Sequence, residues 1–542
     1  MKVFAVLVVC VVVAALAGCG SSDKTFTAVP VGGKPASLTV EPLRAGPVTM
    51  KFADGELRYL QTGDGAGGNI ETVRRVYFAV RDQRFDTPTP VFDKITVVRR
   101  SDSFTAEYAA RVTHNNVEFA WTGQIEGKSD GTIVYTIDGN AVRDFASPRI
   151  GLNVLLGTPT YGGRTLEFTR LNKDESVSET FPKTPTSWDP GRFLTFNSDR
   201  SDGQAAFAAT MDSREFGIED QRQYGDSSFK AYGYLDLPFP NIAAGAKASQ
   251  TLTLTFPDVK PVVRQPETTR ITLGEPKDGA AIPVIRTANG PAGRTGDFNA
   301  AFNRAKRAMT SGQEFVWSFN PALHLNDADM LFENASAVAE QVAAMRRATD
   351  QAKLHINPIT FQWPHSRPAP DGRAKEVLGA AWCVEIIRHL ALSGADEATF
   401  HLMEQSWENS PAGDALKVWA GFSGDALKAH STFADVRYIL DYTTDSPGRC
   451  PVSVLAVNNN MKVRTIFLVN RTAQPQRVTF VQAVAKQAAV SPIQLGRDGW
   501  TSATKQGVRQ SRTGAIRPNG RNVEVLVTPY AVVAFTLTNM EQ

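Results

Sequence analysis

The sequence predicts a multidomain, β-rich chain with an N-terminal antiparallel β-sandwich, a parallel α/β domain and a small C-terminal β-sandwich. Three observations carry this prediction. Strand-like segments separated by turns fill residues 50–262, strand-like and helix-like segments alternate over 263–451, and short strand-like segments return over 452–542. Consecutive strands favour antiparallel sheets, whereas strand–helix alternation favours a parallel sheet.

The first β region is rich in aromatic and β-branched residues, in segments such as ITVVRR (95–100), FTAEYAARVT (104–113) and VEFAWTGQIEG (117–127). Turn signals such as HNN and KSDG separate these segments. The prolines of TLTLTFPDVKPVV (251–263) mark the end of the domain. Residues 19–49 are rich in Gly, Ser, Pro and Thr, so we expect a flexible linker before it.

The α/β region contains three predicted strands, EFVWSFN (314–320), LHINPIT (354–360) and ATFHLM (398–403). Residues 336–352 and 374–394 have helical spacing, and Gly394 is a stop signal for the second helix. In parallel sheets of this kind a ligand lies beyond the carboxyl ends of the strands. The last region, with segments such as VSVLAVNN (452–459) and AVVAFTLT (531–538), is again β.

The N-terminus predicts export and lipidation. Lys2 precedes an apolar run, residues 3–17, that is shorter than the roughly 20 residues of a membrane span. Leu16-Ala17-Gly18-Cys19 resembles the bacterial lipobox, which implies removal of residues 1–18 and a lipid on Cys19. A plain signal peptide cut near Ala17 is the alternative. We expect a protein tethered to the cell envelope, in the outer membrane if the cell has one, because Gly20 replaces the Asp of inner-membrane retention.

Charge and motifs narrow the classes of partner. The net charge is +3 without a long basic run, which argues against nucleic acid. No HExxH, CxxC, GxSxG or phosphate-binding glycine loop is present, so we expect no metal and no cofactor. Cys383 and Cys450 remain after processing, and either a disulfide or a buried free thiol at Cys383 agrees with the sequence.

Polar residues gather where the predicted parallel strands end. The catalytic candidates are His324, Asp327 and Glu404, and the substrate-binding candidates are Asn320, Asn357, Trp363, His365, His401 and Trp407. Imidazole and carboxylate groups supply acid–base catalysis, and indole faces suit sugar rings. Asn326 or Asp327 could instead cap the following helix. His389 within a helix and His355 within a strand are more typical of structural histidines.

A second polar stretch lies in the β region, with Glu219, Asp220, Arg222, Asp226 and Lys230 close together in sequence. Composition alone favours an ion-pair network here over a binding site. This stretch, GIEDQRQYGDSSFKAYGYLDLPFP (217–240), resembles the EDQRN, DASFK and LPFP segments of the D-apionate lactonases. GELRYL (55–60), PRIGLNVL (148–155), FVWSFNPALHLND (315–327) and INPITF (356–361) fit the same family in order.

The resemblance implies a β domain, a TIM-like middle domain and a C-terminal β domain, and hydrolysis of a sugar-acid lactone. Two departures stand out. The middle region has about 190 residues against about 250 for an eight-unit barrel, which implies that the front units are deleted. In GDFNAAFNR (296–304) we expect a family Glu where Ala301 stands.

Three functions follow from this. The first is a tethered hydrolase for a carbohydrate lactone, with Glu404 or His324 as general base and Asp327 orienting His324. The second is a catalytically degenerate relative that binds carbohydrate. The third is a scaffold lipoprotein whose open barrel edge meets an envelope protein partner.

Overall fold

The computed structural model describes residues 23–170, 176–198, 207–212, 216–278, 280–288, 296–307, 312–322, 324–325, 327–349, 351–361, 371–401, 410–422, 436–459, 463–481, 490–493, 509–511 and 513–538. The predicted signal and Cys19 lie outside these residues. The chain divides into two compact units. The first comprises residues 1–181, 189–219 and 229–263, and the second comprises 182–188, 220–228 and 264–542.

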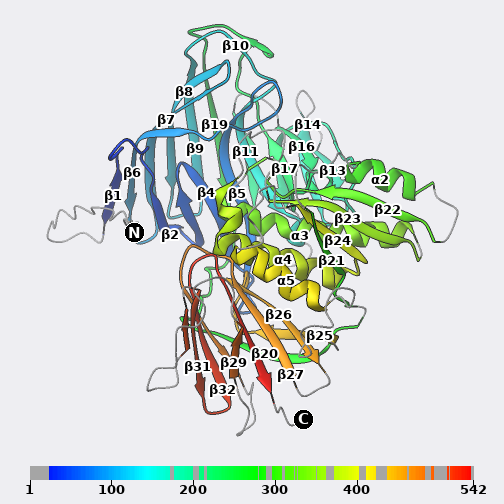
Figure 1. Cartoon of the computed structure of the whole chain (residues 1–542). Coiled ribbons are helices and arrows are strands. Elements are labelled where there is room, and N and C mark those ends of the chain that lie inside the picture. The colour runs from blue at the N-terminus through cyan, green and yellow to red at the C-terminus, as the bar shows by residue number, and fades with distance from the viewer. Residues whose placement is uncertain are drawn as a thin grey trace. The chain divides into compact units, whose positions relative to one another are not determined.

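The first unit consists almost entirely of strands, which belong to a 17-stranded antiparallel sheet and a small two-stranded one (Figure 1). The elements before residue 264 are β1 Lys24–Ala28, β2 Thr39–Ala45, β3 Val48–Ala53, β4 Glu56–Gly63, β5 Asn69–Val80, β6 Val91–Arg99, β7 Phe104–His114, β8 Val117–Gly127, β9 Ile133–Ala141, β10 Phe145–Ala146, β11 Ile150–Gly157, α1 Thr158–Tyr161, β12 Thr165–Arg170, β13 Ser176–Thr180, β14 Arg192–Ser198, β15 Ala208–Met211, β16 Phe216–Asp220, η1 Arg222–Tyr224, β17 Ser228–Tyr232, β18 Asn241–Ile242 and β19 Lys247–Thr255.

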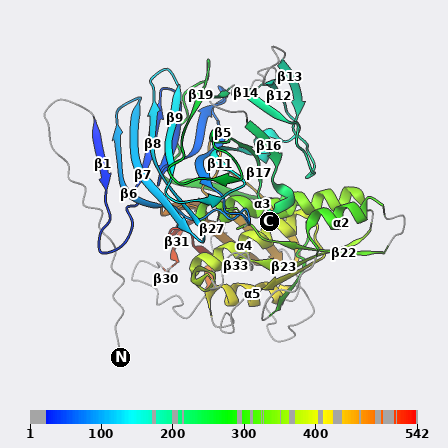
Figure 2. The ribbon, with the colours of Figure 1, turned by 90° about the horizontal axis from the view of Figure 1, so that it is seen from above.

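Alternation of side chains explains why these segments form strands with one buried face. In β7 and β8, buried and more exposed residues alternate along the whole length. The two strands pair from Phe104 opposite Gly127 to His114 opposite Val117. Figure 2 shows β6, β7, β8 and β9 running side by side. Gly127 is required here because a side chain at that position would meet the ring of Phe104.

The second unit begins with the α/β segment. Its elements are β20 Thr269–Pro276, β21 Val284–Ala288, α2 Phe298–Ala305, β22 Glu314–Phe319, α3 Ala328–Ala348, β23 Lys353–Thr360, η2 Gly372–Lys375, α4 Val377–Ser393, β24 Glu397–His401, α5 Pro411–Phe422, β25 Val436–Thr444, β26 Val452–Asn459, β27 Val463–Asn470, β28 Gln476–Phe480, β29 Val490–Ile493, β30 Arg509–Ser511, β31 Gly514–Asn519, β32 Asn522–Val527 and β33 Val532–Thr538. β20 joins β25–β33 in a ten-stranded sheet.

Four strands of this unit form a separate parallel sheet in the order β22–β23–β24–β21. Helix α4 packs beside it with Trp382, Cys383 and Ile386 fully buried, and burial of each large apolar side chain contributes about 1.5–3 kcal/mol. Gly394 ends α4 in the left-handed conformation with φ 79°, as its sequence position predicted.

The structure confirms a β-rich chain with a large antiparallel sheet. The segment 19–49, predicted as a flexible linker, contains β1, β2 and the start of β3, and β1 pairs with β6. The predicted strands 314–320, 354–360 and 398–403 correspond to β22, β23 and β24, and the predicted helices correspond to α3 and α4. Cys383 and Cys450 are free thiols, and the first is buried. Among the helices in the described ranges, none is both long and apolar enough to cross a membrane.

Candidate functional site

An aspartate–histidine pair lies at the carboxyl end of the parallel sheet. His324 follows β22, and its Nδ1 lies 2.6 Å from Oδ2 of Asp226, in the loop between β16 and β17. The side chains are 15% and 5% exposed, respectively. A carboxylate at Nδ1 favours the tautomer that is protonated on Nδ1 and fixes the orientation of the ring.

Helix α3 holds the aspartate from its other side. Asn334 Nδ2 donates to Asp226 Oδ1 at 2.8 Å and to the carbonyl of Pro321, and Asn334 Oδ1 accepts from the backbone N–H of Ser227 at 3.2 Å. Both oxygens of Asp226 are therefore engaged. The ring of Tyr224, from the same loop, meets the His324 ring edge-on with centroids 5.8 Å apart.

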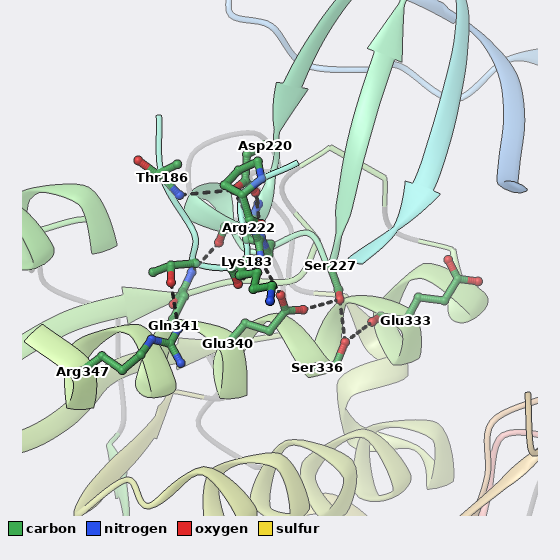
Figure 3. A network of polar contacts seen from close by, with 12 residues as sticks. Lys183, Thr186, Asp220, Arg222, Ser227, Glu333, Ser336, Glu340, Gln341 and Arg347 are labelled. Carbon is green, nitrogen blue, oxygen red and sulfur yellow. Dashed lines mark hydrogen bonds and ion pairs between the residues drawn. The ribbon is translucent and has the colours of Figure 1, made fainter. Parts of the chain in front are cut away.

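The loop that carries Asp226 is fastened to α3 by a buried ion-pair network (Figure 3). The Arg222 guanidinium makes a two-pronged contact with Asp220, at 2.9 and 2.7 Å, and donates to Glu340 at 2.8 Å. Burial lowers the pKa of Arg222, but the hydrogen bonds and charges of Asp220 and Glu340 outweigh it, so the pKa is raised. Burial raises the pKa of Asp220, against the lowering effect of its hydrogen bonds and charge contact with Arg222.

Further hydrogen bonds join the loop that carries Asp226 to α3. Glu340 Oε1 accepts from the hydroxyl of Ser227 at 2.9 Å, Ser336 donates to the same Ser227 oxygen, and Gln341 donates to the carbonyl of Arg222 (Figure 3). Gly225 turns the loop with φ 100°, and a side chain there would collide with the carbonyl of Asn320. Only glycine satisfies both conditions without strain.

The strand ends bring together some of the residues predicted for the site. Asn320 donates to the hydroxyl of Thr360 at 2.6 Å, and Thr360 is the neighbour of His401 in the pairing of β23 with β24. Asn357 lies within β23, half-buried. Asp327 caps α3, since its Oδ1 accepts from the N–H of Met330 at 3.2 Å. Trp363, His365, Glu404 and Trp407 lie outside the described residues.

A second acid–base group occupies the amino ends of the same strands. Ligand atoms of Glu314, His355 and Glu397 lie within 4.8 Å of one another, close enough for one metal ion to reach all three. Lys353 already lies 3.2 Å from Glu314 and 2.8 Å from Glu397, and Arg286 also pairs with Glu397. Two cations therefore occupy the position that a metal would need, and this group suits a salt-bridge network.

The sequence predicted His324 as a site residue but not Asp226 or Asn334, although it marked the polar stretch that contains Asp226. Asp226 is separated from His324 by 98 residues and from Asn334 by 108. In the sequence, the dense polar stretch and Gly225 indicate an ordered loop, but they do not indicate which residues this loop contacts.

Comparisons with known proteins relate the N-terminal part of the chain to a family. Residues 31–259 match the family model described as D-apionate lactonase, N-terminal domain. A D-apionate lactonase of Brucella anthropi is 27% identical over 244 residues, which cover 43% of this chain and 38% of that protein. The match thus spans less than half the length of that relative. These two matches confirm the resemblance drawn from the sequence, over residues 31–259.

Solved structures give weaker likenesses. An arabinofuranosidase of Xanthomonas axonopodis pv. citri is 14% identical with a TM-score of 0.31, over 47% of this chain and 58% of that one. A putative aldose 1-epimerase of Escherichia coli K12 is 9% identical with a TM-score of 0.28, over 40% of this chain and 99% of that one. At such TM-scores neither likeness bears on the fold or function of this chain.

Proposed function

We propose that this chain hydrolyses a sugar-acid lactone, with His324 as general base and Asp226 as the group that orients it. The observation that carries this proposal is the 2.6 Å contact between His324 Nδ1 and Asp226 Oδ2 at the carboxyl end of the parallel sheet. The match of residues 31–259 to the D-apionate lactonase N-terminal family supports a lactone as substrate. An oriented imidazole is the usual means of activating water.

The reaction runs in two proton transfers. His324 takes a proton from water through Nε2 as the water oxygen attacks the ring carbonyl, and Asp226 stabilises the imidazolium that forms. The tetrahedral intermediate then expels the ring oxygen, which receives the proton back from His324. Water and lactone thus become one open-chain hydroxy acid, and nothing else is consumed.

The strand order supports a shortened barrel as the scaffold of this site. In a closed barrel the first strand pairs with the last. Here β21, the first of the four strands in the chain, pairs with β24, the last. If βα units were lost between β21 and β22, the first and last strands would still pair with each other. We therefore assign the missing units to the interior of the barrel, instead of the front suggested by sequence spacing.

The wider organisation of the protein belongs to the same proposal. In the order of the chain, a β-sandwich domain (residues 50–262) precedes the barrel domain (residues 263–451), and a second one (residues 452–542) follows it. The lipobox-like Leu16-Ala17-Gly18-Cys19 supports a mature protein anchored to the cell envelope by lipid on Cys19. Trp363, His365, Glu404 and Trp407, which follow β23 and β24 in the sequence, remain proposed site residues.

A panel of aldonolactones tests the activity. The full chain, purified in detergent, should open at least one lactone faster than buffer, as followed by acid release. His324→Gln should lower turnover by about 10²–10⁴-fold, the usual contribution of a general base. His355→Gln is the matched control, because His355 is also half-buried among carboxylates but at the amino ends of the strands. Equal losses in the two variants would contradict the assignment.

One observation favours carbohydrate binding without turnover as the second candidate. Ala301, where the family resemblance leads us to expect Glu, lies within α2 and is fully buried in the apolar core. A missing carboxylate would leave the site able to bind but not to hydrolyse. Saturable binding of a sugar-acid lactone without acid release is the result that selects this candidate.

A further inference from the structure

A cluster of cations and tyrosine rings lies in the first unit, whereas the aspartate–histidine pair belongs to the second. Arg192 on β14 lies directly opposite Gly217 on β16. Its guanidinium carbon lies 5.5 Å from the centre of the Tyr232 ring and 5.8 Å from that of Tyr234. Arg149 lies over the same Tyr232 ring at 4.0 Å. Cation–π contacts of this kind hold guanidinium groups in place.

Gly217 makes this arrangement possible. A side chain at that position would collide with the ring of Tyr232 and with the guanidinium of Arg192. The hydroxyl of Tyr232 accepts from Arg192 Nη1 at 3.3 Å. Burial, followed by the charge of Glu219, raises the pKa of Tyr232 to about 12, so this phenol keeps its proton at neutral pH.

Positive charge is concentrated around a single shared carboxylate. Glu219 lies 3.3 Å from the ammonium group of Lys230 and 3.8 Å from the guanidinium of Arg149. Lys230 is only 2% exposed, whereas Arg192 is 38% exposed and Glu219 25% exposed. The carboxylate nearest to Arg192 is that of Asp189, at 3.8 Å, and it is 59% exposed, where solvent weakens its pull.

We propose that this cluster binds the carboxylate of an acidic sugar, an aldonate or a uronate, through the exposed edge of Arg192. A guanidinium fork matches a carboxylate in a two-pronged contact, and stacking on two rings lowers the entropy lost on binding. The partly exposed ring of Tyr234 offers an apolar face to the sugar, and Glu219 accepts hydrogen bonds from its hydroxyls. The site is independent of the hydrolysis proposed above.

Calorimetric titration of the full chain with D-galacturonate tests this site, with D-galactose as the neutral probe and inorganic phosphate as the generic anion. The titrations are made in the His324→Gln background, so that a failure of the proposed hydrolysis does not affect them. We expect galacturonate to bind at least about tenfold more tightly than galactose, since one charged hydrogen-bonded contact is worth roughly 1.5–3 kcal/mol.

Arg192→Gln should weaken galacturonate binding by about tenfold or more and leave the melting curve nearly unchanged, because Arg192 is substantially exposed. Arg99→Gln is the matched control, since Arg99 stacks on Phe26 at 5.2 Å in the same unit. Equal binding of galactose, equal effects of the two variants, absence of saturable binding, or displacement by phosphate at equal concentration would each overturn the proposal. Tyr234→Ala gives a second test, with loss of affinity for the sugar acid expected but not for phosphate.

Discussion

Two histidines of the second unit lie near opposite ends of neighbouring parallel strands and meet carboxylates in different ways. His324, beyond the carboxyl end of β22, contacts Asp226, whose second oxygen is held by the neutral amide of Asn334. His355, near the amino end of β23, lies 3.6 Å from Glu314 and 3.7 Å from Glu397 and also contacts the hydroxyl of Thr399 at 2.8 Å.

The charges around the two rings differ. Glu314 and Glu397 are already shared with Lys353 and Arg286, so the amino-end group is close to neutral with His355 uncharged. Burial lowers the pKa of His355 and outweighs the opposing charges of Glu397 and Glu314. The aspartate of the carboxyl-end pair is held by an amide and an imidazole, which leaves its charge available to stabilise an imidazolium. The comparison shows that the partners of the carboxylates, and not only burial, set the charge around each ring.

The strongest way to break this comparison is to change each carboxylate to an amide. Asp226→Asn can no longer stabilise the imidazolium or select the tautomer of His324, so we expect lactone turnover to fall by about 10²–10⁴-fold. Glu314→Gln, in the amino-end group, should leave turnover within about twofold of the parent. Initial rates on the most active lactone of the panel measure both. A similar loss in Glu314→Gln would mean that the two groups do not differ in function.

The second contrast concerns stability. A loop that is bound to α3 carries Asp226, whereas the strands themselves carry Glu314, His355 and Glu397. Arg222→Gln leaves the buried Asp220 carboxylate without its cation, and we expect a loss of about 3–5 kcal/mol in the free energy of unfolding. Arg286→Gln removes a guanidinium that is 54% exposed, and less than about 1 kcal/mol should be lost. Urea denaturation of the purified variants measures both. Equal losses would show that the Arg222 network adds no more stability than a surface ion pair.

Much of the local structure could be predicted from the sequence because it depends on neighbours along the chain. The apolar runs at 314–320 and 354–360, the helix stop at Gly394 and the capping role of Asp327 all follow from residues within one or two turns. The pairing of His324 with Asp226 could not be predicted in this way, because it joins residues 98 positions apart through a loop and a helix. The sequence marked His324 as a catalytic candidate and placed Asp226 in a stretch that favoured an ion-pair network, and only the tertiary contact assigns them to each other.

The sequence allowed two roles for Asp327, which are capping α3 and orienting His324, and substitutions at this position distinguish them. If its role is to satisfy the first N–H groups of the helix, Asp327→Ala should cost about 1 kcal/mol, within a range of roughly 0.5–2 kcal/mol. Asp327→Asn should preserve both stability and turnover, since Asn caps helices as well as Asp does. Thermal denaturation and the lactone assay measure the two variants together. Loss of turnover in a stable Asp327→Asn protein would restore the role of Asp327 in orienting His324.

The smallest effect concerns the pH dependence of stability. Because the pKa of His355 is lowered in the folded chain, the unfolded chain binds a proton below about pH 6.5 that the folded chain does not. Stability should therefore decline as the pH falls from about 6.5 through the folded pKa of His355. His355→Gln should flatten this part of the curve, whereas stability held by Glu397, whose pKa Lys353 and Arg286 lower against the effect of burial, is lost only below about pH 4.3. Urea denaturation between pH 5 and 8 measures the slope. An unchanged slope in His355→Gln would mean that the ring takes up its proton equally in both states and that its carboxylate partners fully offset its burial.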